Sequence, residues 1–161
     1  MSLRNISVTL ECFIKKGDKY LMLQRNSKKR IMPGVWMAPG GHREFNEGLF
    51  ECARREILEE TGLKIKNLRI KAVGNAHLKD LKQEIFFTFV FADYESGELK
   101  NDLNEGTLAW LTPSEIANLD NLLAEIKYTL PDLFKDNSKV ISYKAIYEKG
   151  NKLTSFNLEK S

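Results

Sequence analysis

Residues 41–63 of this 161-residue chain read GHREFNEGLFECARREILEETGL. Three of their carboxylates, Glu56, Glu59 and Glu60, stand at positions i, i+3 and i+4, which share one face of an α-helix. A pair of neighbouring glutamates alone is typical of an ordinary solvated helix face. Three carboxylates held so closely repel one another without a cation, and Mg²⁺ prefers oxygen ligands together with substrate phosphates. The spacing therefore predicts a magnesium site and a phosphate-bearing substrate.

The residues around these carboxylates predict the helix that carries them. Phe50, Ala53 and Ile57 form one apolar stripe over 47–61, as expected for a helix with one face in the core. Gly62 is a typical helix stop. We expect the stripe to face the core and the carboxylates beside it to border a cleft.

The remaining chain predicts a mixed α+β fold without an internal repeat or a linker. Strands are expected at 6–14, 20–23, 68–73, 84–94 and 108–111, with a terminal hairpin of 139–147 and 152–158. Helices are expected to start at 112–115 and to cover 121–130, where Pro131 interrupts or ends the second one. An extended piece at 36–39 is expected to break at Gly40 and Gly41, whose backbone can approach a metal or ligand closely.

Composition narrows the class of protein. The net charge is +3, and the densest basic cluster, 28–30, is short for a nucleic-acid arm. It is either a solvated loop or an aid in attracting an anionic ligand. Cys12 and Cys52 form no CxxC motif and are expected to be ordinary thiols. The sequence offers neither an apolar run of about 20 residues nor a signal-peptide core, so we expect a cytoplasmic protein without membrane contact.

The spacing in 41–63 matches the Nudix box, GX5EX7REUXEEXGU, with U a bulky aliphatic residue. Every fixed position is filled, by Gly41, Glu47, Arg55, Glu56, Ile57, Glu59, Glu60, Gly62 and Leu63. The chain thus resembles the Nudix hydrolases. Its 36–41 approach, its 105–110 segment and its C-terminal helix and hairpin resemble the nucleoside triphosphatase branch, which includes MutT and the animal oxidised-purine triphosphatase. The resemblance implies one domain over 1–161, an α/β/α sandwich with a mixed β-sheet and the box as a loop-helix-loop.

The resemblance also implies roles for the box residues. The ligands of Mg²⁺, which Mn²⁺ can replace, would be Glu56, Glu59, Glu60 and the carbonyl of Gly40. Arg55 would hold a box carboxylate through charge-assisted hydrogen bonds, and Glu47 would fix the loop. The alternative for Arg55 and Glu47 is a salt bridge on the helix surface.

A catalytic carboxylate is expected outside the box. MutT-like proteins carry one in the region of Glu105, five residues before Trp110. Glu84, which precedes an aromatic strand, is the competitor, and a solvated loop carboxylate is the alternative. The metal would position the attacking water and lower its pKa, while Glu56 or Glu105 would act as the general base.

The expected substrates are nucleoside triphosphates, with 8-oxo-dGTP as a candidate, cut to the monophosphate and pyrophosphate. Met37 replaces an amide side chain of the animal enzyme, and a thioether pairs poorly with a purine edge, which argues against oxidised-guanine selectivity. Counting back from Pro131 puts Glu125 near a base-reading carboxylate, although it could be a solvated helix residue. Trp36 is either core or a stacking platform, and Arg25 is a candidate phosphate contact.

Other functions stay open from the sequence. The substrate could be ADP-ribose, a nucleotide sugar or a dinucleoside polyphosphate. A non-catalytic nucleotide sensor is disfavoured by the intact box, and an RNA-end hydrolase by the lack of a basic stripe. We expect a small-molecule nucleotide partner, no stable nucleic-acid complex, and a monomer or homodimer.

Overall fold

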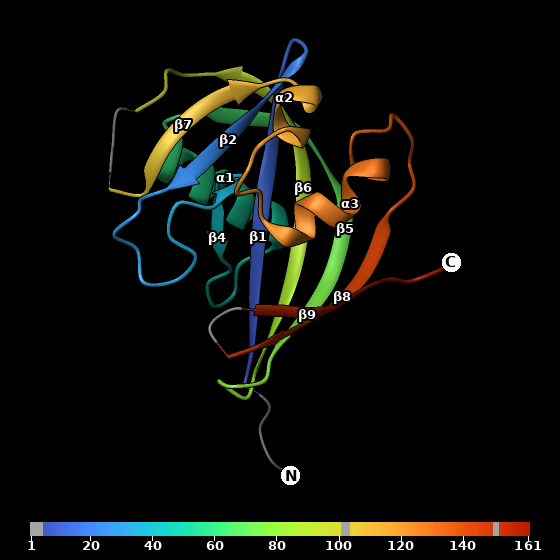
Figure 1. The fold of residues 1–161 in the computed structure, drawn as a ribbon. Helices are drawn as coiled ribbons and strands as arrows, with labels where there is room; N and C mark the ends of the chain where they lie inside the picture. The colour runs from blue at the N-terminus through green and yellow to red at the C-terminus, as the bar shows by residue number, and fades with distance from the viewer. Residues whose placement is uncertain (1–4, 101–103, 150–151) are drawn as a thin grey trace.

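The computed structural model describes residues 5–100, 104–149 and 152–161. The described residues form mostly strands, interrupted by one helix in the first half of the chain and by a pair of helices in the second half (Figure 1). In order they are β1 (Ile6–Lys16), β2 (Lys19–Arg25), β3 (Trp36–Met37), β4 (Gly40–His42), α1 (Leu49–Thr61), β5 (Lys64–Leu78), β6 (Gln83–Ser96), β7 (Gly106–Leu111), α2 (Pro113–Ala117), α3 (Ala124–Leu133), β8 (Ile141–Glu148) and β9 (Lys152–Leu158).

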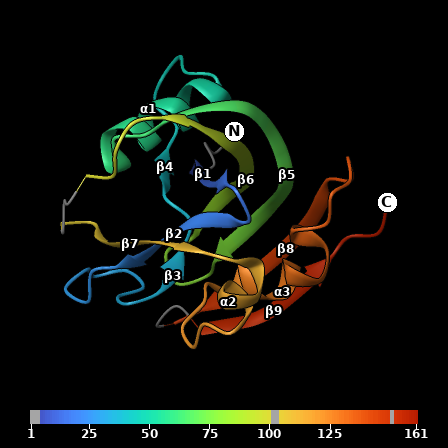
Figure 2. The ribbon, with the colours of Figure 1, turned by 90° about the horizontal axis from the view of Figure 1, so that it is seen from above.

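The strands form one nine-stranded mixed sheet, in the order β3-β2-β1-β6-β5-β8-β9, while β4 pairs with β1 and β7 with β2. The pairs β1–β6 and β5–β8 are parallel, and the other pairs are antiparallel. Seen from above, the sheet curls, with α1 on one side and α2 and α3 on the other (Figure 2). The structure therefore confirms the expected α+β sandwich.

The sheet splits beside the helix that carries the carboxylates. β1 and β2 pair only near their turn, at Lys15 with Tyr20 and Lys16 with Lys19. Beyond that point β4 takes the place beside β1, and β3 the place beside β2. The chain crosses the split at 38–39, and this crossing brings Gly40 to α1.

Alternation along β1 separates two cores. Leu10, Cys12 and Ile14 are buried with the apolar stripe of α1. Phe13 points to the opposite face, where it is buried beneath α2 and α3. Because successive side chains of a strand point to opposite faces, Glu11 shares the face of Phe13.

Two sequence predictions about the chain before α1 are wrong. Gly40 and Gly41 do not break the extended segment, because they belong to β4 and pair with Leu10 and Glu11 of β1. The helix α1 begins at Leu49 rather than at Glu47, while its end at Gly62 is confirmed by a left-handed φ of 79°.

The C-terminal half also differs in detail. Pro131 lies inside α3, which continues to Leu133, because this exposed proline stands in the last turn, where it interrupts little of the hydrogen bonding. Residues 121–123 are not helical, because Asn121 lies in a turn and Leu122 forms an isolated parallel bridge with Trp36. β5 covers 64–78, far beyond the expected 68–73, because register shifts along its pairing with β6 break the alternation of the sequence. Part of the expected turn, residues 150–151, lies outside the described residues.

The expectations about the cysteines and about membrane-spanning segments can be compared with the structure. Cys12 and Cys52 are both buried and unpaired, as expected for ordinary thiols. No helix in the described part of the chain is long and apolar enough to cross a membrane.

Candidate active site

Arg55 organises the carboxylates of the box. Its Nε donates to Glu47 Oε1 at 2.7 Å and its Nη2 to Glu47 Oε2 at 3.0 Å. Its Nη1 donates to Glu56 Oε1 at 2.8 Å and to Glu59 Oε2 at 3.3 Å. Nη2 also reaches the carbonyl of His42 at 3.0 Å. One guanidinium thus ties the loop before α1 to two of the predicted metal ligands.

These contacts fix the charge of Glu47. Hydrogen bonds from Arg55, followed by the backbone N–H of Glu44, lower the pKa of Glu47 to about 2. The same bonds with Glu47 raise the pKa of Arg55. Both shifts favour the ionised forms, so Arg55 and Glu47 can hold each other as an ion pair at neutral pH.

The two glycines of β4 make room for the site. A Cβ on Gly41 would lie 2.4 Å from Cδ of Glu56, and one on Gly40 would lie 2.1 Å from the carbonyl oxygen of Leu10. The backbone N–H of Gly40 donates to Glu60 Oε2 at 3.1 Å. The close packing of β4 between β1 and α1 therefore depends on glycine at both positions.

The pKa of Glu60 shifts in the opposite direction to that of Glu47. Burial raises its pKa to about 7, and the charges of Glu56 and Glu105 add to this rise, whereas the N–H of Gly40 and the charge of Arg25 oppose it. The charges of Glu105 and Arg25 therefore reach the box, while their roles in catalysis and phosphate binding stay predictions. A bound cation would favour the charged form of Glu60.

Glu105 stands at the entry to β7. Lys29 Nζ lies 2.9 Å from its Oε1, and the carbonyl of Glu105 accepts a hydrogen bond from Asn26 N at 3.0 Å. Its competitor Glu84 on β6 pairs with Ile6 of β1, whereas Gly40 pairs with Glu11 of β1. Ile6 and Glu11 are five residues apart along the strand. At about 3.3 Å per residue that is roughly 16 Å away, so of these two carboxylates it is Glu105 that lies near the box.

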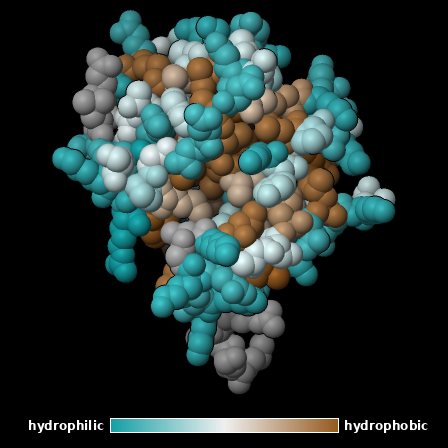
Figure 3. Space-filling view, viewed as in Figure 1, coloured by the Kyte–Doolittle hydropathy of each residue, from teal (hydrophilic) through white to brown (hydrophobic). Residues whose placement is uncertain are grey.

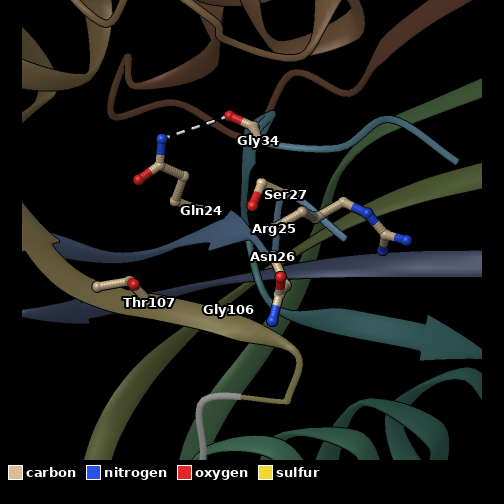
Figure 4. Close-up of a pocket in the computed structure, with 7 residues that line it drawn as sticks. All are labelled: Gln24, Arg25, Asn26, Ser27, Gly34, Gly106 and Thr107. Atoms are coloured by element: carbon tan, nitrogen blue, oxygen red, sulfur yellow. Dashed lines mark hydrogen bonds between the residues drawn. The ribbon is translucent and has the colours of Figure 1, made fainter. Parts of the chain in front are cut away.

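A cavity of about 320 Å³ opens where β2 ends and β7 begins. The residues that line it are Gln24, Arg25, Asn26, Ser27, Gly34, Gly106 and Thr107. Figure 4 shows Gln24 and Thr107 on one side and the Arg25 side chain extending away from them. The guanidinium Nε of Arg25 donates to the carbonyl of Ile31 at 3.1 Å, so the arginine supports the loop after β2.

The donor set of the box fits a hard divalent cation. The side chains of Glu56, Glu59 and Glu60 offer carboxylate oxygens, which are the ligands that Mg²⁺ prefers. Among the described residues, however, no three histidine, cysteine or acidic side chains are gathered as a ready-made site. Glu56 and Glu59 turn to Arg55, and Glu60 turns to Gly40. A cation at this face would take oxygens that are now shared with Arg55.

Trp36, Met37 and Glu125, the residues expected near the base of a nucleotide, belong to the core beneath α2 and α3 and not to the core beneath α1. Trp36 and Met37 are half-buried against the core beneath α3. Trp36 N donates to the carbonyl of Asn121 at 2.7 Å, and its carbonyl accepts from Leu123 N at 2.9 Å. Glu125 is only 2% exposed, so the solvated alternative for this residue is wrong.

Glu11 is a residue of this region that sequence reasoning missed. It is 1% exposed, and its Oε2 accepts a hydrogen bond from Ala38 N at 3.1 Å. Burial raises its pKa well above the ordinary 4.5. The available signal was a single acidic residue within the otherwise apolar run of β1, since ionisable side chains are rarely fully buried without a reason.

Comparison with known proteins agrees with this geometry. The NUDIX domain family model matches residues 6–133, and the chain therefore belongs to the Nudix family. The uncharacterised Nudix hydrolase YvcI of Bacillus subtilis is 36% identical over 112 residues, 67% of each chain. The nucleoside triphosphatase NudI of Escherichia fergusonii is 27% identical over 70% of this chain and 86% of that one.

A solved structure extends the likeness to nearly the whole chain. The MutT protein from Bacillus halodurans superimposes with a TM-score of 0.82 at 26% identity, covering 95% of this chain and 97% of that one. Fold, box and relatives together define an enzyme: a Nudix hydrolase of nucleotide derivatives.

Proposed function

We propose that this enzyme is a Mg²⁺-dependent pyrophosphohydrolase of nucleoside triphosphates, with 8-oxo-dGTP among its candidate substrates. The products would be a nucleoside monophosphate and pyrophosphate. The observation that carries the proposal is the carboxylate face of α1, in which Arg55 aligns Glu56 and Glu59 while Glu60 accepts a hydrogen bond from the backbone of Gly40. The likeness to a nucleoside triphosphatase over 86% of that protein's length supports the substrate class.

The metal would be held by Glu56, Glu59, Glu60 and the carbonyl of Gly40. When bound, Mg²⁺ neutralises phosphate charge and lowers the pKa of water, with Mn²⁺ as a substitute. The chain supplies the remaining functions. Arg55 keeps the carboxylates in register with the loop through its contacts to Glu47.

Two further roles are those of the general base and of the phosphate contact. Glu105 or Glu56 would accept a proton from the attacking water as a new P–O bond forms and the phosphoanhydride bond breaks. Arg25 would contact a phosphate, and it lies near enough to lower the pKa of Glu60. Lys29 now pairs with Glu105 and would have to share that carboxylate with the reaction.

The partner in this account is a small-molecule nucleotide, bound by a monomer or homodimer without nucleic acid or membrane. Cys12 and Cys52 are buried, unpaired thiols, which suit the reducing cytoplasm as the place of action.

The test is a substrate panel with purified protein and Mg²⁺, following pyrophosphate and phosphate release. The panel contains the common nucleoside triphosphates, 8-oxo-dGTP, ADP-ribose, a nucleotide sugar and a dinucleoside polyphosphate. We expect pyrophosphate from triphosphates. Turnover restricted to ADP-ribose, the nucleotide sugar or the dinucleotide would overturn the proposed substrate class and keep the family.

A further inference from the structure

Lys29 and Glu105 form an ion pair that is built differently from the clamp of Arg55. Lys29 Nζ lies 2.9 Å from Glu105 Oε1, and the two side chains are 32% and 44% exposed. Arg55, in contrast, holds Glu47 through two parallel bonds. Water screens exposed ion pairs, so they contribute little to stability and separate easily. Lys29 can therefore leave Glu105 when a ligand offers it a stronger partner.

The loop after β2, which carries Lys29, is fixed by its own hydrogen bonds. Lys28 N donates to Asn26 Oδ1 at 3.0 Å, and Lys29 N donates to the carbonyl of Asn26 at 3.0 Å. Farther along the loop, the carbonyl of Ile31 accepts from Arg25 Nε at 3.1 Å. These bonds hold the backbone, whereas the lysine ammonium sits on a flexible four-carbon stem. The loop thus keeps its shape while the charged end of Lys29 is able to move.

This loop carries an excess of positive charge. Residues 25–30 contain four cations, Arg25, Lys28, Lys29 and Arg30, and Glu105 pairs with one of them. Figure 3 shows hydrophilic side chains on the left of the molecule, the side where the loop after β2 lies in Figure 1. Positive charge gathered at one place attracts anionic ligands and raises their local concentration.

The ion pair lies beside both the cavity at the end of β2 and the box. Arg25 lines the cavity, and so does Gly106, the residue that follows Glu105. The charges of Arg25 and Glu105 also act on the pKa of Glu60, which belongs to the box. Through Glu105, Lys29 is therefore next to a cavity of about 320 Å³ and close to the carboxylates that would hold the metal.

We propose that Lys29 binds a phosphate of the substrate, and that its ammonium moves from Glu105 to that phosphate as the substrate enters. This proposal rests on the proposed nucleotide hydrolase function and adds a residue outside the box that recognises the polyphosphate chain. A phosphate offers more acceptor oxygens and more negative charge than one carboxylate, so it outcompetes Glu105 for the ammonium. The same movement leaves Glu105 free to accept a hydrogen bond from water. Substrate binding and release of the candidate base are thereby coupled.

Lys29→Met removes the ammonium and leaves an unbranched side chain in its place. Lys79→Met is the matched control, because Lys79 Nζ also lies 2.9 Å from a carboxylate, that of Glu148. Lys79 follows the end of β5, where the strand pairs with the remote Glu84. The control therefore breaks an ion pair of the same length away from the box.

The experiment titrates inorganic tripolyphosphate into each protein by isothermal calorimetry, at low salt and without Mg²⁺. We expect Lys29→Met to bind about tenfold more weakly than wild type, as for the loss of one hydrogen bond to a charged group. Lys79→Met should bind as wild type does. The same loss should appear when Lys29→Met is added to Glu105→Gln, since a direct contact with phosphate does not require Glu105. With Mg²⁺, Lys29→Met should raise KM for a nucleoside triphosphate by a similar factor and change kcat much less.

Three other results decide against the inference or against the function beneath it. Equal binding and equal KM in Lys29→Met and wild type would overturn the phosphate contact. A loss that disappears in the Glu105→Gln background would overturn it too, because Lys29 would then act only by neutralising Glu105. If no nucleoside triphosphate were hydrolysed with Mg²⁺, the proposed function would fall, and the tripolyphosphate titration would still decide whether Lys29 binds phosphate.

Discussion

Glu47 and Arg55 meet in a two-point ion pair, with Nε 2.7 Å from Oε1 and Nη2 3.0 Å from Oε2. The pair joins the loop before α1 to the middle of the helix. The same guanidinium reaches Glu56 and Glu59, so the position of the loop and the direction of two carboxylates are set together. Such parallel bonds need the planar fork of arginine.

Arg55→Lys tests this arrangement. An ammonium cannot make both bonds to Glu47 and still reach Glu56, so we expect activity to fall by about 10- to 100-fold, as for other residues that orient metal ligands. Steady-state hydrolysis and a circular dichroism melt would measure the effect on catalysis and folding. Arg54→Lys, an exposed neighbour on α1, is the control. Equal activity of the two variants would contradict the role of Arg55.

Gly41→Ala tests the close approach of β4 and α1. Its Cβ would lie 2.4–2.6 Å from the carboxylate atoms of Glu56, which must therefore move. A displacement of about 1 Å in a reacting constellation costs on the order of 100-fold in rate. Gly48→Ala is the control, because its Cβ would meet only the end of the Glu51 side chain at 3.2 Å. Wild-type kcat in Gly41→Ala would show that Glu56 need not stay in place.

Glu105→Gln tests the carboxylate outside the box. If Glu105 takes the proton from water, its loss should lower kcat by about 100-fold and leave KM much less affected. Glu98→Gln, an exposed carboxylate earlier in the same connection, should behave as wild type. An unchanged kcat in Glu105→Gln would leave Glu56 as the general base.

Glu11 predicts a pH dependence of stability. Burial, the charge of Glu125 and the weaker charge of Glu60 raise its pKa above 4.5, although Ala38 N and Arg25 oppose the rise. A raised folded-state pKa means that the native protein binds more protons than the unfolded chain. The stability it contributes is full below about pH 4.5 and is lost as the pH rises towards the folded pKa.

The free energy of unfolding should therefore decline over this range, by up to about 1.4 kcal/mol per pH unit for each proton. Glu125, whose pKa is also raised by burial, adds to the decline. Glu11→Gln cannot titrate at this position and should show a shallower decline in stability as the pH rises above about 5, measured by urea unfolding. Parallel slopes for the two proteins would contradict the burial argument.

The helix of the site could be predicted from sequence because its signals are local. The apolar stripe and Gly62 define α1, and the spacing of Glu56, Glu59 and Glu60 places them on one face. β4 could not be predicted in this way, since Gly40 extends only because it pairs with Glu11, which lies 29 positions earlier. Local sequence patterns indicate helices and turns, but they do not indicate which distant strand a residue will pair with.

The burial of Glu125 and Glu11 was also hard to predict from sequence, because it depends on partners that are distant along the chain. Glu125 gave no local sign of burial, because its partner Tyr147 lies on a different element. Glu11 was missed although it is an acidic residue in an apolar strand, because its burial and its hydrogen bond to Ala38 depend on segments far away in the sequence.

The most direct test of the account is the Mg²⁺ dependence of pyrophosphate release from a nucleoside triphosphate by wild type and Glu59→Gln. Glu95→Gln, on the exposed end of β6, is the control. We predict that wild type and Glu95→Gln need Mg²⁺, and that Glu59→Gln loses about 10- to 100-fold in activity or requires far more Mg²⁺. Identical Mg²⁺ curves for Glu59→Gln and wild type would contradict the assignment of the metal site to this face of α1.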